Sequence, residues 1–442
     1  MLNRKIMKNG LYHKDSTLID FKRNVHKLAL DYLDMYKRSM IHKMSSDELR
    51  REAKNAVITV IKDNSLILPA SVKHDEVIES IVAEAIGLGP LEQLLIDDEI
   101  TEVMVNGPDE IFIEKNGSIL QTNLFFNGHE SLMGIIERIV SPLGRHINES
   151  SPMVDARLED GSRVNAIIPP LSLTGPVLTI RKFPNKSYII DDLITNKTLS
   201  QNMADFLKVC VLNRKNIIIS GGTGTGKTTL LNILADYIPE TERIITIEDA
   251  AELKLHQQHV ITLECRPANI EGKGNITVRD LVKNSLRMRP DRIVVGECRG
   301  GESLDMLQAM NTGHEGSLTT AHANSARDCL SRLEVMVLMA GFDLPVNAIR
   351  EQIVSAIDII IQLTRYSDGS RRVTNIVEVD GMEGDKILLH EIYRFNKQGI
   401  DEYGEIHGSF TGSGFAPNFY QELEETGISV DRGLFSTVQG GF

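Results

Sequence analysis

A glycine-rich run near the middle of the chain constrains the fold more than any other feature. Residues 221–229 read Gly-Gly-Thr-Gly-Thr-Gly-Lys-Thr-Thr and fit the template Gly, four residues, Gly-Lys-Ser/Thr. Residues 216–220, with the sequence Asn-Ile-Ile-Ile-Ser, precede the run as a short buried strand would, and residues 227–238 carry apolar side chains at helical spacing. A strand, a glycine turn and a helix start together aim backbone N–H groups at a phosphate. The pattern therefore predicts a nucleotide-binding loop formed by Gly221, Gly222, Thr223, Gly224, Thr225, Gly226, Lys227, Thr228 and Thr229.

Such a loop needs a metal ion and a group that activates water. Lys227 is placed to reach the β- and γ-phosphates, and the hydroxyl of Thr228 can hold Mg²⁺. Glu248 and Glu297 each end an apolar strand, and ligands of parallel α/β sheets bind at the carboxyl ends of strands. Either acid can orient water or hold the metal, although a strand-end acid can also simply cap the segment that follows. Because the residue before it is Gly296, Glu297 alone must supply the carboxylate for the metal ion at this strand end.

Histidines and arginines extend the list of candidate site residues. His314 lies among glycines and His322 at a strand end, where a neutral imidazole can sense a phosphate or contact a catalytic acid. An arginine from a neighbouring element can stabilise the charge that builds up in phosphoryl transfer. Local chemistry does not choose among the candidates, which are Arg157, Arg163, Arg181, Arg287, Arg289, Arg292 and Arg299.

The chain of 442 residues is long enough for two or three domains. Residues 1–90 carry apolar side chains at helical spacing over 19–40, 45–62 and 75–86, which predicts a helical bundle. Short β-type runs and one helix over 131–140 predict an α+β domain at 91–182. Residues 183–194 are expected to be a linker centred on the polar segment Phe183–Ser187. Over 195–442, buried strands alternate with helices, which predicts a parallel sheet flanked by helices, with loops and a few strands after residue 380.

Composition excludes several classes of protein. The formal net charge of −13, the 5% aromatic content and the absence of Trp argue against a dedicated nucleic-acid-binding surface. Four cysteines without Cys-x-x-Cys spacing argue against a structural zinc site built from cysteine. No apolar run is long enough to span a bilayer, so we expect a cytoplasmic protein.

The ordered motifs resemble those of the type II/IV secretion ATPase superfamily. Its four motifs match residues 221–228, 246–253, 286–297 and 313–322. Further segments resemble the CpaF/TadA branch, which powers Flp (tight-adherence) pili; these are residues 87–92, 101–107, 154–158, 160–165 and 299–302. The Gly-Glu ending at 296–297 departs from general NTPases and matches this superfamily.

The resemblance implies an α/β fold with a RecA-like P-loop NTPase domain behind an α+β N-terminal domain, assembled as a homohexamer. It implies that ATP and Mg²⁺ bind between the two domains, with Glu248 activating water, Glu297 on the metal side, and His314 and His322 as the histidine pair. Arg163 and Arg181 match arginines that reach the nucleotide from the N-terminal domain.

The expected function is a cytoplasmic traffic ATPase, peripheral to the inner membrane, that drives pilus assembly through membrane platform proteins. Three alternatives remain open from the residues. They are a VirB11-like type IV secretion ATPase, a nucleic-acid translocase, and a nucleotide-gated scaffold that does not hydrolyse ATP.

Overall fold

The structure, a computed structural model, describes residues 16–41, 45–64, 73–115, 117–183, 188–266, 273–427 and 430–437. The chain divides into two units, residues 1–186 and 187–442, each of which is described by itself. Residues 184–187, most of the polar segment at the centre of the predicted linker, lie outside the described residues.

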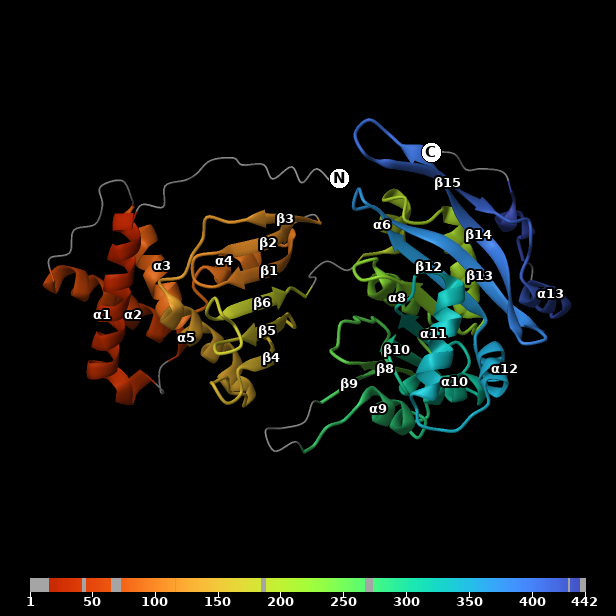
Figure 1. Ribbon diagram of the computed structural model, residues 1–442, viewed down its shortest axis with the longest axis horizontal. Coiled ribbons are helices and arrows are strands. Elements are labelled where there is room, and N and C mark those ends of the chain that lie inside the picture. Colours follow the sequence, from red (N-terminus) through yellow and green to blue (C-terminus); the bar gives the residue numbers. More distant parts are fainter. Residues whose placement is uncertain are drawn as a thin grey trace. The chain divides into compact units, whose positions relative to one another are not determined.

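Three helices open the N-terminal unit, as the helical periodicity predicts (Figure 1). They are α1 (Ser16–Ile41), α2 (Ser46–Asp63) and α3 (His74–Ile86). Their apolar stripes pack together around a small core that includes Val57 and Ile81. His26 of α1 is 7% exposed, and burial lowers its pKa to about 4; the nearby Arg138 guanidinium adds to this, and a hydrogen bond with the Glu84 backbone opposes it.

An antiparallel sheet follows the bundle, with α5 (His129–Val140) packed against it. The strand order among the described residues is β3-β2-β1-β6-β5-β4. The strands are β1 (Ile100–Asn106), β2 (Ile111–Lys115), β3 (Ser118–Gln121), β4 (Met153–Arg157), β5 (Arg163–Ile167) and β6 (Val177–Arg181), and the short helix α4 (Leu91–Ile96) precedes them. The sequence prediction missed β3 and β4, because they are the two edge strands and β3 has no buried residue to give an alternating pattern.

The helical bundle and the sheet belong to one unit, although we expected a boundary near residue 90. The buried Glu84 of α3 accepts hydrogen bonds from the backbone N–H (2.6 Å) and the side-chain amide (2.7 Å) of Asn127. Arg138 of α5 donates to the Glu84 carbonyl (2.6 Å) and to the Gly87 carbonyl (3.0 Å). These buried polar contacts fasten the end of the bundle to the α+β part.

The second unit is built on a mixed sheet with helices on both faces (Figure 1). Its order among the described residues is β15-β14-β13-β12-β7-β11-β10-β8-β9, and the six strands from β12 to β9 are parallel. Those six strands are β7 (Ile217–Gly221), β8 (Ile244–Glu248), β9 (Val260–Glu264), β10 (Arg292–Cys298), β11 (Leu318–Ala321) and β12 (Ile359–Arg365). Ile217 and Ile219 point into one core while Ile218 points into the other, which explains the unbroken apolar run.

Helices on each face cover these strands. One core holds side chains of α6 (Ile190–Thr195), α7 (Gln201–Leu212), α8 (Lys227–Ala235) and α13 (Asn418–Glu425). The other holds side chains of α9 (Val278–Ser285), α10 (Glu302–Asn311), α11 (Ala326–Leu338) and α12 (Val346–Ala356). The expected linker to residue 194 is therefore too long, because α6 already packs Leu193 into the core of this unit.

The C-terminal part differs most from expectation. We expected loops with a few strands, and the chain forms long antiparallel strands that extend the parallel sheet. They are β13 (Arg371–Glu383), β14 (Lys386–Ile400) and β15 (Ile406–Gly412). Their register shifts at several points, and such bulges disturb the simple alternation by which strands are recognised. Among the described helices, none combines the length and the apolar character that crossing a bilayer requires.

Candidate active site

The predicted phosphate loop joins the end of β7 to the start of α8. Gly224 and Gly226 have φ of +70° and +95°, a region that side chains other than glycine rarely adopt. A Cβ on Gly221 would lie only 2.7 Å from the Leu363 carbonyl oxygen. The loop therefore folds as the motif predicts, and its glycine cradle in front of a helix N-terminus suits a phosphate group.

Lys227 starts α8, and its ammonium donates to the Gly222 carbonyl at 2.9 Å. Burial lowers the pKa of Lys227; the negative charge of Glu297 works in the opposite direction, and Arg299 adds to the lowering. Both groups therefore act on the Lys227 ammonium. Thr228, predicted to hold Mg²⁺, follows Lys227 on the first turn of α8, and Glu297, the other predicted ligand, is close enough for its charge to act on Lys227. A hydroxyl and a carboxylate are oxygen ligands of the kind that Mg²⁺ prefers.

Glu297 does not stand alone at the end of β10. Arg299 donates to one Glu297 carboxylate oxygen from Nε (3.0 Å) and from Nη2 (2.8 Å), and it forms an ion pair with Asp249 at 3.5 Å. The hydrogen bond to Glu297 raises the pKa of Arg299. Local chemistry did not choose among the candidate arginines. In the structure, Arg299 contacts two carboxylates at this edge of the sheet, those of Glu297 and Asp249.

Glu248 ends β8 and is 3% exposed. Its Oε1 accepts from the backbone N–H groups of Glu252 (2.9 Å) and Leu253 (3.1 Å). A Cβ on Gly296 would lie 3.0 Å from Glu248 Cγ, so the glycine before Glu297 leaves room for this side chain. The Glu248 carboxylate therefore holds the loop after β8 in place through these two hydrogen bonds.

The two histidines lie at opposite ends of β11. His322 follows the strand at its carboxyl end, the edge that also carries the phosphate loop. His314 precedes the strand, and its half-buried ring belongs to the loop that leads into Ser317. The structure therefore brings His322, and not His314, to the edge where Glu248 and Glu297 end their strands.

Arg292 is a structural residue. It is fully buried at the start of β10, where Nε donates to Glu242 (2.5 Å) and the other two nitrogens donate to the carbonyls of Gly316 and Val211. This end of β10 is opposite to the end that carries Glu297.

Three arginines of the N-terminal unit form a row across neighbouring strands. Arg157 of β4 pairs with Arg163 of β5, and Arg163 pairs with Arg181 of β6. Residues directly opposite each other project from the same face of a sheet, and like charges in such pairs repel. The row is bordered by a carboxylate, because Glu102 of β1 pairs with Arg181. Its predicted contact with the phosphate loop of the other unit stays a prediction.

Sequence reasoning missed two arginines beside the phosphate loop. Arg365 and Arg371 face each other across the β12–β13 hairpin. Arg371 Nε donates to the Gly224 carbonyl at 2.9 Å, and Arg365 Nη1 lies 3.2 Å from where a Cβ on Gly224 would be. The only signal in the sequence is the Asp368-Gly369 turn between them, which indicates a hairpin but not its neighbour.

Fold and site together define a P-loop nucleotide-hydrolysing enzyme. The family model described as "Type II/IV secretion system protein" matches residues 84–398, so the chain belongs to that family, and it is an ATPase. The superfamily that the motifs resemble is thereby confirmed.

Individual relatives carry more specific names than the family model does. The chain is 31% identical to the conjugal transfer protein TrbB of Rhizobium radiobacter over 317 residues, 71% of this chain and 90% of that protein. It is 32% identical to the type IV secretion system protein VirB11 of Bartonella henselae, over 67% of this chain and 93% of that protein. The crystal structure of the VirB11 ATPase of Brucella suis is 29% identical, covers 66% of this chain and 96% of that one, and has a TM-score of 0.37. The names of the two relatives correspond to the VirB11-like alternative rather than to the CpaF/TadA branch.

Proposed function

We propose that the chain is the motor ATPase of a type IV secretion or conjugation system. It works as a ring of six copies on the cytoplasmic face of the inner membrane. The observation that carries the proposal is the grouping of Lys227, Glu297 and Arg299 at one edge of the sheet in a member of the type II/IV secretion family. Two relatives matched over at least 90% of their own length are named for conjugal transfer and for type IV secretion.

In this mechanism Lys227 leaves the Gly222 carbonyl and takes hold of the β- and γ-phosphates of ATP. Thr228 and Glu297 would hold Mg²⁺, which would neutralise charge on the phosphate oxygens. Glu248 accepts the proton of the attacking water, a step that requires its carboxylate to share or release the amide of Glu252.

The second half of the site comes from the arginine row of the N-terminal unit. Arg163 and Arg181 stabilise the charge that develops on the transferred phosphoryl group. Binding of ATP closes the two units about the linker, and hydrolysis releases them. That movement is passed on to the membrane-embedded transfer apparatus.

Lys227→Ala tests the catalytic core of this proposal. We expect steady-state phosphate release to be abolished while far-UV circular dichroism and thermal unfolding stay as in the wild type. Lys386→Ala, an exposed lysine at the start of β14, is the matched control and should retain activity. Normal turnover in Lys227→Ala would refute the mechanism.

The ring assembly and the identity of the secretion system that the ATPase serves need separate tests. With nucleotide, the particle mass should be near six times 49.2 kDa; a persistent monomer would contradict the ring. Complementation of a strain lacking the gene should restore transfer of DNA or protein. Restoration of surface pili, with prepilin and platform genes beside the gene, would instead favour the Flp/Tad system that the motifs at residues 87–107 resemble. Strong stimulation by single-stranded DNA would favour a nucleic-acid translocase.

A further inference from the structure

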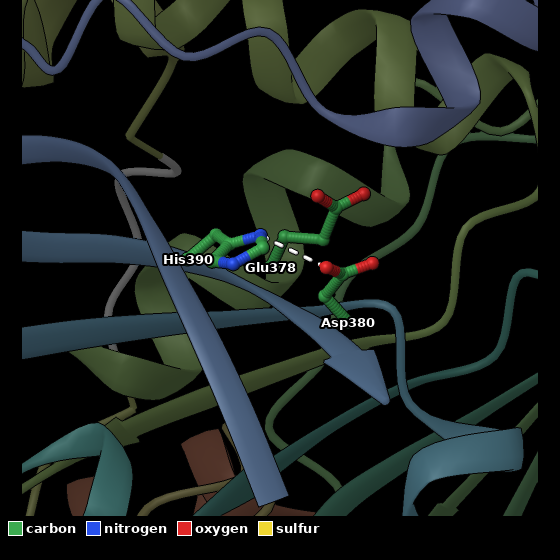
Figure 2. Close-up of side chains that lie close together, drawn as sticks. All are labelled: Glu378, Asp380 and His390. Atoms are coloured by element: carbon green, nitrogen blue, oxygen red, sulfur yellow. Dashed lines mark ion pairs between the residues drawn. The ribbon is translucent and has the colours of Figure 1, made fainter. Parts of the chain in front are cut away.

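Three side chains with metal-binding chemistry meet in the second unit, outside the nucleotide site. They are Glu378 and Asp380 of β13 and His390 of β14, and one ligand atom of each lies within 4.8 Å of the others. His390 Nδ1 is 3.0 Å from Asp380 Oδ2. Figure 2 shows the imidazole on one side and the two carboxylates facing it.

The strand geometry explains why these residues converge. Glu378 and His390 are directly opposite in the β13–β14 ladder, so their side chains share one face. The register shifts between Val379 and Gly381, so Asp380 is the extra residue of a β-bulge. Bulges redirect side chains, and this one adds a second carboxylate to the cross-strand pair.

Glu378 supplies an independent sign that the cluster binds a ligand. The residue is 6% exposed, and its Oε1 accepts from the Asn418 backbone N–H at 3.0 Å. Its Oε2 is buried and has no hydrogen-bond partner among the described residues. Buried carboxylate oxygens are normally paired, because leaving one without a donor or a cation is costly.

The charge around this oxygen favours a cation. The negative charges of Asp380 and Asp358 and the positive charge of Lys215 act on the Glu378 carboxylate, to which the Asn418 amide donates. Lys215 is itself paired with Asp358 at 3.5 Å. The cluster therefore holds more negative than positive charge.

We propose that Glu378, Asp380 and His390 bind one divalent transition-metal ion, and that Zn²⁺ is the ion whose preferences they match best. Two carboxylates and an imidazole are common Zn²⁺ ligands, and three protein ligands leave one position for water. The imidazole disfavours Mg²⁺ and Ca²⁺, which prefer oxygen ligands alone.

The position of this site indicates a structural role rather than a catalytic one. Glu378 pairs with Ile359, which pairs with Ile217 at the start of β7, whereas the phosphate loop follows the end of β7. The ion therefore lies at the opposite edge of the sheet from ATP. It would fasten β13 to β14 and, through Asn418, to the start of α13, since Asn418 also donates from its side chain to Asp380.

The same unit offers a matched comparison. Asp401, Glu405 and His407 of the β14–β15 turn also have ligand atoms within 4.8 Å of one another. Glu405 and His407 are exposed, however, and Asp401 already accepts from the N–H groups of Tyr403 and Glu405 and contacts His407 at 3.0 Å. This cluster shows no buried, unpaired oxygen, so it serves as the control.

Zn²⁺ titration of the full-length, chelator-treated protein without nucleotide tests the proposal. By calorimetry we expect one tight site per chain in the wild type and in His407→Asn. Glu378→Gln and His390→Asn should each weaken that site by at least about 100-fold. Zn²⁺ should raise the unfolding temperature of the wild type and of His407→Asn only, and Mg²⁺ should not replace it.

Two results would overturn the metal site. One is a wild-type protein that binds no Zn²⁺ more tightly than about 100 µM, a binding free energy well below that of a structural zinc site. The other is unchanged stoichiometry and affinity in both cluster variants. If Glu378→Gln does not fold, His390→Asn decides the question alone, because the His390 side chain is 40% exposed and tolerates replacement.

Discussion

Glu248 can act as a structural acceptor for the loop after β8 or as the base that activates water. Two substitutions at this position distinguish the two roles. The buried carboxylate Oε1 accepts from the N–H groups of Glu252 and Leu253, so it holds the loop after β8. We also predict that it takes the proton from the attacking water. Glu248→Gln keeps the shape of the side chain and one acceptor oxygen, whereas Glu248→Ala removes the acceptor altogether.

The hydrogen bonds set the expected change in stability. In Glu248→Gln the amide oxygen can occupy the Oε1 position and retain both bonds, so the free energy of unfolding should fall by less than about 1 kcal/mol. In Glu248→Ala two backbone donors lose their acceptor, at about 1–3 kcal/mol each when buried, which gives about 2–6 kcal/mol. Urea denaturation of the full-length protein, followed by circular dichroism, measures both values.

Steady-state phosphate release then distinguishes the two duties. A general base contributes about 100- to 10,000-fold to the rate, so Glu248→Gln should lose that factor while remaining almost as stable as the wild type. A residue that only holds the loop predicts the reverse, with activity lost in Glu248→Ala and kept in Glu248→Gln. Turnover of Glu248→Gln within about threefold of the wild type would therefore refute the assignment of Glu248 as the base.

Three further outcomes are expected. The folded-state pKa of His26, about 4, lies below its ordinary value of 6.5, so stability that is present above pH 6.5 is lost as the pH falls toward 4. The loss is about 2 kcal/mol at pH 5, and urea denaturation should detect it in the wild type but not in His26→Leu. Arg371→Ala removes the donor to the Gly224 carbonyl and should raise the KM for ATP by about threefold to tenfold, with kcat nearly unchanged in phosphate-release assays. Arg181 pairs with Arg163 on one side and with Glu102 on the other, so Arg181→Gln removes one repulsion and one attraction. It should change the unfolding free energy by less than about 1 kcal/mol while lowering ATP turnover by about 1,000-fold.

Local patterns predicted the parts of this protein that local chemistry determines. The phosphate loop is set by glycines within one turn, and Glu297 was found because it ends an apolar strand of a parallel sheet. Edge strands such as β3 bury no side chain on either face, so they carry no hydrophobic period to detect. The C-terminal hairpins were underestimated for a related reason, since bulges interrupt their alternation.

Contacts between distant segments could not be predicted in this way. Arg371 is 147 residues after Gly224, and its hydrogen bond depends on β12 lying next to β7 in the sheet order. Glu378 and His390 meet only because the register of β13 against β14 places them opposite each other. One residue of slip would turn one of the two to the other face.

Burial of a charged side chain does not by itself mark a functional residue in this protein. A buried polar atom without a hydrogen-bond partner does. Arg292 is fully buried, yet Glu242 and two backbone carbonyls satisfy it, and it lies at the edge of the sheet away from the phosphate loop. The Oε2 atom of Glu378 is buried without a donor among the described residues. That costs stability, which the chain regains when an ion of opposite charge binds. On this reasoning the β13–β14 cluster requires a cation.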